Sequence, residues 1–111
     1  MKHLHILWTN ADETTGKLMV MMYAKNAMEN HWWDQVTVIV WGGTVKLLAQ
    51  SPALQEEMAQ AREWGVHFTG CIACAQELGA VEEMERLGVE LYKWGPPLTE
   101  LLQSGQPLLT I

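Results

Sequence analysis

Short runs of large apolar residues alternate along the chain with stretches whose apolar positions recur at helical spacing. Residues 2–9 (KHLHILWT) alternate between apolar and polar side chains and predict a first strand. Residues 35–41 (QVTVIVW) are mostly β-branched and are followed by glycines, which is typical of a strand buried on both faces of a parallel sheet. Three later runs predict further strands, at residues 66–70 (VHFTG), 89–95 (VELYKWG) and 106–111 (QPLLTI).

The segments between these strands predict helices. Residues 44–65 predict a short helix and then a longer one, because Ser51 can cap a helix whose first position, Pro52, tolerates proline. Gly65 is well suited to end the longer helix. Residues 14–30 predict an earlier helix, with side chains near helical spacing at Leu18, Met21, Met22, Lys25 and Met28. Shorter helical segments follow at residues 71–79, 80–88 and 96–105.

Strands and helices therefore alternate through the whole sequence. Short βα units of this kind require parallel strands joined by right-handed crossovers, so we expect an α/β fold, a three-layer sandwich with a five-stranded, mostly parallel sheet. No repeat or linker divides residues 1–111, which we interpret as a single domain. In such folds reactive groups gather beyond the carboxyl ends of the strands. Those ends are Thr9-Asn10, Trp41-Gly42-Gly43, Gly70-Cys71 and Trp94-Gly95.

Composition narrows the class of protein to which the chain belongs. Apolar residues make up 49% and charged residues 18% of the 111 positions, which argues against a disordered chain and leaves little charge to cover the surface of a monomer. Seven Met and six Trp residues favour an apolar surface buried against another subunit, although one large core would also account for them. Composition alone leaves both alternatives open.

The charge pattern argues against polyanionic partners. The net charge is −6 and the seven Lys and Arg residues are scattered, so the basic stripe that phosphate backbones require is missing and nucleic acid is not an expected partner. No apolar run approaches the roughly 18 residues of a membrane span, and residues 1–10 turn polar too soon for a signal peptide. We expect no membrane association and a cytoplasmic location.

The cysteines of the chain, Cys71 and Cys74, have Cys-x-x-Cys spacing. In a reducing compartment such a pair is more often catalytic, redox-active or metal-binding than a structural disulfide. Cys71 falls at the carboxyl end of the third predicted strand, and Cys74 lies one turn later on the same face of the helix that follows. Both thiols are then expected at a helix start, where unpaired N–H groups and the helix dipole favour thiolates. Gly70 permits a tight turn into this helix, and Gly79 can end it.

The cysteine pair also fits three alternative roles. Cysteine is often buried, so either thiol can be a packing residue. A thioredoxin-type redox pair is another alternative, although the expected strand order differs from that fold and the proline usual near its site is missing. A zinc site needs about four ligands, and beyond this pair and His67 a second subunit would have to supply more. We therefore predict no metal and no bound cofactor.

On these residues the chain resembles the DsrE/DsrF-like family, which includes TusD-type sulfur-relay subunits and small uncharacterised homologues. The resemblance covers nearly the whole chain: the opening strand with TNADET, VTVIVWGG running into TVKLLAQSP, GVHFTGCIACAQELG, and the closing GPPLTELLQSGQPLLTI. Its most specific feature is a cysteine at the end of the third strand with a glycine eight positions later, here Cys71 and Gly79. The resemblance implies a sulfur carrier that holds sulfane sulfur as a persulfide on Cys71, exchanges it with donor and acceptor proteins, and assembles as a trimer or hexamer. Cys74, which many relay members lack, can resolve that persulfide into a disulfide or be the acceptor itself.

A pocket is expected around Cys71 if the strand order is that of the family. Its backbone nest and polar groups would suit a small anion or a partner's thiol. The pocket candidates are Asn10, Trp41, Gly42, Gly43 and Thr44, with Gly70 next to the cysteine. A tight turn from strand to helix would also explain Gly42-Gly43. His3 and His5 share one face of the first strand and need hydrogen-bond partners more than they suggest ligands.

The leading hypothesis is an intracellular sulfur carrier, a carrier more than a turnover enzyme, and whether it has sulfurtransferase-like activity stays open. A second hypothesis is an oligomeric small-ligand-binding or regulatory module with redox-sensing cysteines. A third is a Cys-x-x-Cys thiol oxidoreductase. The fold by itself does not decide among them, because one fold supports many functions.

Overall fold

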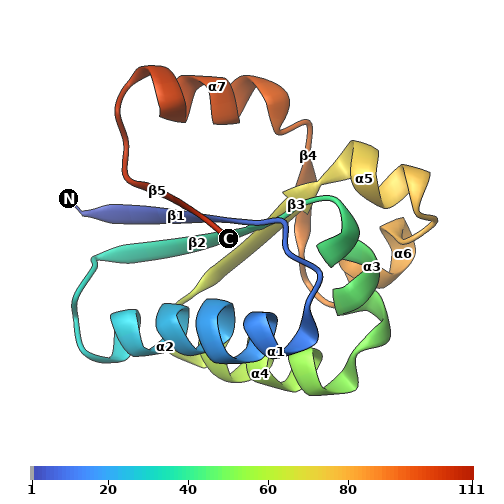
Figure 1. Ribbon diagram of the computed structural model, residues 1–111, viewed down its shortest axis with the longest axis horizontal. Helices are drawn as coiled ribbons and strands as arrows, with labels where there is room; N and C mark the ends of the chain where they lie inside the picture. Colours follow the sequence, from blue (N-terminus) through green and yellow to red (C-terminus); the bar gives the residue numbers. More distant parts are fainter. Residues whose placement is uncertain (1) are drawn as a thin grey trace.

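The computed structural model describes residues 2–111 and has helices on both faces of a five-stranded, all-parallel sheet (Figure 1). The sheet has the spatial order β4-β3-β2-β1-β5. Its strands are β1 (His3–Trp8), β2 (Gln35–Val40), β3 (His67–Cys71), β4 (Glu90–Tyr92) and β5 (Leu108–Thr110). The predicted three-layer α/β sandwich is confirmed, and each predicted strand is present, although β4 and β5 are shorter than expected.

The helices follow the predicted order. They are α1 (Glu13–Thr15), η1 (Gly16–Met21), α2 (Met22–Glu29), α3 (Gly43–Gln50), α4 (Pro52–Glu63), α5 (Ile72–Glu77), α6 (Val81–Arg86) and α7 (Gly95–Gln103). Ser51 caps α4 as predicted, because its hydroxyl oxygen accepts the N–H of Leu54 over 3.1 Å. Gly65, with a φ of +98°, follows the end of that helix, also as predicted.

The order of the strands explains why the two faces of the sheet are covered unequally. From β1 to β4 the chain adds each strand on the same side, so right-handed crossovers place the connecting helices on one face. The step from β4 back to β5 runs in the opposite direction, and the same handedness puts α7 on the other face. Figure 1 shows α2 and α4 on one side of the sheet and α7 alone on the other. No residue of α7 is buried, so this helix covers its face only loosely.

The two faces of the sheet also differ in chemistry. Ile6, Val38 and Phe68 pair across β1, β2 and β3 and belong to the buried apolar core. One position earlier, on the opposite face, the row is His5, Thr37 and His67. The face under α7 therefore carries polar side chains next to the centre of the fold.

The first helix departs from the predicted regular α-helix. Residues 16–21 form a π-helical turn, in which the N–H of Met22 reaches the carbonyl of Lys17. Leu18 and Met22, at two of the positions that the predicted helix placed on one face, are 52% and 46% exposed. The buried positions are Gly16, Val20, Met21, Ala24 and Ala27.

Candidate functional site

Cys71 is the last residue of β3 and the N-cap of α5. Its backbone is extended, with φ −78° and ψ 114°, so the chain can turn from strand to helix at this residue. The Sγ atom accepts a hydrogen bond from the N–H of Cys74 over 3.3 Å, as the oxygen of a capping Ser or Asp does in other helices. The residue is only 6% exposed. Cys71 thus lies where the sequence predicted it, with its sulfur at the helix start.

Cys74 lies one turn further along α5 and is partly exposed. Its Sγ accepts the backbone N–H of Gly42 over 3.3 Å. Burial raises the pKa of the Cys74 thiol, and its hydrogen bond with Cys71 raises that pKa further, while the N–H of Gly42 acts in the opposite direction. The expectation that the helix start acidifies both thiols is therefore wrong for Cys74, because desolvation outweighs the N–H dipole.

Of the other pocket candidates, Gly42 is the residue that contacts a cysteine through a hydrogen bond. Thr44 is buried, and its hydroxyl donates to the carbonyl of Trp8 over 2.8 Å and accepts the N–H of Trp41 over 3.0 Å. This hydroxyl joins the end of β1 to the start of α3. Thr44 and Trp41 therefore fix the backbone next to the cysteines and do not contact the sulfur atoms through hydrogen bonds.

Asn10 and Gly43 lie on the exposed side of the same end of the sheet. The side-chain oxygen of Asn10 accepts the N–H of Asp12 over 3.0 Å, which shapes the loop that follows β1. Gly43 begins α3. Neither residue forms a hydrogen bond to the cysteines within residues 2–111.

Gly70 is a packing residue. It is buried on the face of β3 opposite Cys71, and a Cβ atom there would lie 3.2 Å from the carbonyl oxygen of Val40 and 3.3 Å from the side chains of Leu91 and Val89. Gly79 ends α5 with a φ of +65°, as predicted.

Residues 2–111 contain neither a cluster of metal-ligating side chains nor a helix suited to a membrane. Within that range no three His, Cys, Asp or Glu side chains lie close enough together to hold a metal ion. His67 bonds Glu90, with Nε2 2.8 Å from Oε1. None of the helices there has the length and apolar character needed to cross a bilayer.

A second concave region lies on the other face of the sheet, between β1 and α7, and sequence reasoning missed it. His5, Trp94 and Glu100 are among the residues that line it. Two features of the sequence lie at this region: His3 and His5 alternate along the first strand, and Trp94 precedes a helix that starts with prolines. Neither signal indicates a cavity until the packing of α7 is known.

Comparison with known proteins gives one informative relative. No protein-family model matches the chain, and no curated protein does. A conserved protein of unknown function, BT1422 from Bacteroides thetaiotaomicron, has a solved structure that is 34% identical and matches with a TM-score of 0.95, over 99% of this chain and 95% of that chain. The chain belongs to the family of BT1422.

Two further solved structures share the fold of the BT1422 family at lower identity. A protein of unknown function, MTH1491 from Methanobacterium thermoautotrophicum, is 16% identical with a TM-score of 0.81, and the ychN protein from E. coli is 18% identical with a TM-score of 0.74. Both matches cover 100% of each chain. At these identities they establish the common fold alone.

Proposed function

We propose that the protein is a sulfur carrier of the DsrE/DsrF type, in which Cys71 accepts a sulfane sulfur as a persulfide and passes it to a partner protein. The observation that carries the proposal is the hydrogen bond from the N–H of Cys74 to Sγ of Cys71 at the start of α5. This N–H directs its positive end at the sulfur that would become anionic. The helix itself (IACAQE) has no Lys or Arg, so within α5 the positive ends of dipoles are backbone N–H groups.

The transfer balances without a redox partner. The Cys71 thiolate attacks the outer sulfur of a donor persulfide, forms a new S–S bond and displaces the donor as its thiolate. In the second half, the thiolate of an acceptor attacks the outer sulfur on Cys71 and restores the Cys71 thiolate. One sulfur atom moves in each step, and no net oxidation occurs.

The state of Cys74 favours a carrier over an oxidoreductase. Attack by Cys74 on the inner sulfur of the Cys71 persulfide would form a disulfide and release hydrogen sulfide. That attack requires a Cys74 thiolate, and burial raises the pKa of this thiol. The raised pKa lowers the share of Cys74 thiolate and so slows this attack, which favours keeping the persulfide on Cys71 for an acceptor.

The proposal extends to assembly as a homo-oligomer, a trimer or hexamer, and to a cytoplasmic location, where thiols stay reduced. Exposed large apolar side chains support the assembly, because contact with another subunit would remove them from water. They include Leu18, Met22, Trp32, Trp64 and Leu102. Light scattering of the purified chain should give the mass of three or six copies, and a monomer would contradict this part of the proposal.

The direct test is the intact mass of three proteins after incubation with glutathione persulfide, read before and after reduction. We expect the wild type and Cys74→Ser to gain one sulfur atom that reduction removes, and Cys71→Ser to gain none. Cys74→Ser is the matched control, because it removes the other thiol of the same helix. A gain that disappears only in Cys74→Ser would show that Cys74 accepts the sulfur, which contradicts our assignment of that role to Cys71. No gain in any variant excludes the carrier, and a Cys71–Cys74 disulfide in place of the gain supports an oxidoreductase.

A further inference from the structure

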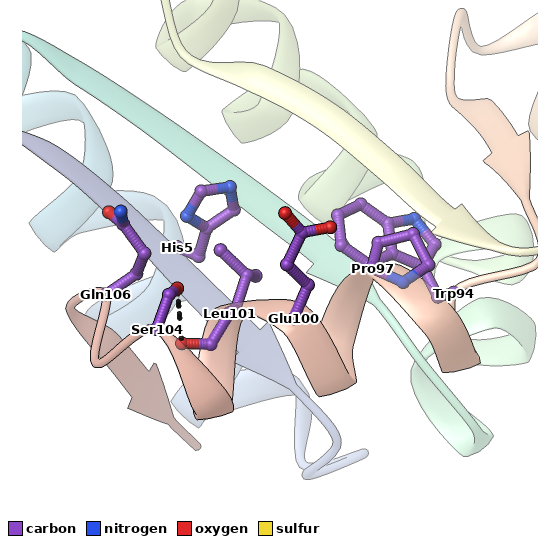
Figure 2. Close-up of a pocket in the computed structure, with 7 residues that line it drawn as sticks. All are labelled: His5, Trp94, Pro97, Glu100, Leu101, Ser104 and Gln106. Carbon is purple, nitrogen blue, oxygen red and sulfur yellow. Dashed lines mark hydrogen bonds between the residues drawn. The ribbon is translucent and has the colours of Figure 1, made fainter.

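A cavity of ≈ 270 Å³ lies between α7 and the face of the sheet that α7 covers. Its walls include His5 from β1, Trp94 from the segment before α7, and Glu100 and Leu101 from α7 itself. Neither cysteine lines it. Figure 2 shows the carboxylate of Glu100 between the rings of His5 and Trp94 in this view. The volume suits a ligand smaller than a typical drug molecule.

His5 lines this cavity, and its two ring nitrogens differ in how far a ligand can reach them. The other histidines of the same face have partners, since Nε2 of His3 lies 2.8 Å from the hydroxyl of Thr37 and Nε2 of His67 lies 2.8 Å from Glu90. The Nδ1 atom of His5 is buried, with almost no accessible surface, and has no hydrogen-bond partner within residues 2–111, so Nε2 is the ring nitrogen that a ligand can reach. With the ring proton on Nδ1, Nε2 carries the lone pair and can accept a hydrogen bond from a donor in the cavity.

The charge state of His5 decides which hydrogen-bonding groups its ring presents to a ligand. Burial, together with the nearby His3 and His67, lowers its pKa to about 4. The ring is therefore neutral at physiological pH and has one N–H and one nitrogen lone pair. A neutral imidazole accepts a hydrogen bond from a cationic donor without repulsion.

Trp94 offers the cavity an aromatic surface. Its indole N–H donates to the hydroxyl of Thr69 over 3.0 Å, so the polar atom of the ring is already paired. The ring makes an edge contact with His5, with centroids 6.5 Å apart and an interplanar angle of 65°. Leu101 adds an apolar wall. A fixed indole beside an apolar wall suits the body of a small organic ligand and attracts cations.

Glu100 supplies the negative charge of the cavity. Its carboxylate forms no salt bridge with any Lys, Arg or His in the part of the chain that the structure describes. The protein as a whole has a net charge of −6, so its field attracts cations and repels anions. A carboxylate, an indole face and an imidazole lone pair together match an ammonium group on an apolar body.

We propose that the cavity between α7 and the sheet binds a small primary amine. The ammonium group donates hydrogen bonds to the Glu100 carboxylate and to the lone pair on Nε2 of His5, and the apolar part of the ligand lies against Trp94 and Leu101. This site is separate from the cysteines, and its existence does not depend on sulfur transfer.

The test uses three probes of nearly equal size: phenethylamine, the neutral 2-phenylethanol and the anionic phenylacetate. Titration of the isotope-labelled full chain, followed by amide chemical shifts, should show saturable shifts around His5, Trp94 and Glu100 with the amine. We expect 2-phenylethanol to bind about tenfold more weakly or worse, because a hydrogen bond to a charged group is lost, and phenylacetate not to bind. Equal binding of the three probes, or no saturable shift with phenethylamine at millimolar concentration, would overturn the proposal.

Substitutions then assign the role of each group. Glu100→Gln should weaken amine binding about tenfold, because it removes the charge and retains the shape of the side chain. Glu63→Gln in α4, on the opposite face of the sheet, makes the same change in net charge and should leave binding unchanged. His5→Leu should also weaken the amine, and its amide spectrum reports whether the fold is kept. Unchanged affinity in a folded Glu100→Gln protein, or equal weakening in Glu63→Gln, would contradict the site.

Discussion

The backbone N–H of Gly42 donates a hydrogen bond to Sγ of Cys74 over 3.3 Å, which joins the start of α3 to α5 across 32 residues of sequence. Gly42 has a φ of +69° and a ψ of −135°, a conformation that residues with a Cβ atom adopt only with strain. The environment of the Cys74 sulfur thus depends on a backbone shape that glycine provides at low cost.

Gly42→Ala should therefore lower both stability and the reactivity of Cys74. Backbone strain should reduce the free energy of unfolding by about 1–3 kcal/mol. Displacement of the N–H should raise the pKa of Cys74 further, since that hydrogen bond opposes the rise caused by burial. Urea unfolding measures the first effect, and the pH dependence of alkylation in a Cys71→Ser background measures the second.

Gly43→Ala is the matched control for that substitution. A Cβ atom at Gly43 would lie 3.4 Å from the Cβ of Ala11, which is an ordinary contact, and its φ is not in the left-handed region. We expect a change of only a few tenths of a kcal/mol, within the usual range of surface substitutions. Equal losses in both variants would show that the conformation of Gly42 is not the cause.

Gly16→Ala should destabilise the core where the π-helical turn begins. A Cβ atom at Gly16 would come within 2.9 Å of Cζ2 of Trp8, a fully buried ring that has no room to move. The expected loss in the free energy of unfolding is about 1–3 kcal/mol. Combining the substitution with Trp8→Phe should give less than the sum of the two losses, because the smaller ring frees this space. Strict additivity in urea unfolding would contradict the proposed contact.

Thr69→Val should destabilise the face under α7. The Thr69 hydroxyl accepts the indole N–H of Trp94 over 3.0 Å and donates to the carbonyl of Glu90 over 2.6 Å. Valine keeps the shape but leaves the buried indole N–H without a partner, which costs about 1–3 kcal/mol. Thr69→Ser keeps the hydroxyl and should lose less in thermal or urea unfolding. A larger loss in Thr69→Ser would mean that methyl packing, and not the hydrogen bond, matters at this position.

The stability of the protein should decrease as the pH falls through the titration range of His5. Its pKa is lowered from 6.5 to about 4, so between these values the unfolded chain binds a proton that the folded chain excludes. Above pH 6.5 this residue makes no pH-dependent contribution, and the full loss is reached near pH 4. His5→Gln should make urea unfolding less dependent on pH across this window. An unchanged dependence in the variant would contradict the prediction.

Much of the fold could be predicted from local patterns. The β-branched run at residues 35–41 predicted the strand β2, and Ser51 before Pro52 predicted the cap of α4. Both could be predicted because strand preference and capping depend on the residues next to them in the chain. The π-helical turn could not be predicted in this way. It coincides with the contact between Gly16 and Trp8, and that contact exists only after β1 and the first helix have packed.

The candidate site also has features that the sequence predicted and features that it did not. The spacing of Cys71 and Cys74 and their place after the third strand were readable from the sequence, because a turn of helix sets the distance between them. The sequence also indicated an α/β sandwich with reactive groups beyond the carboxyl ends of its strands. Only the tertiary structure decided that Gly42 donates to Cys74, that Gly70 packs in the core, and that α7 and His5 line an open cavity. Those features depend on burial and on contacts between distant segments, and local sequence patterns do not contain that information.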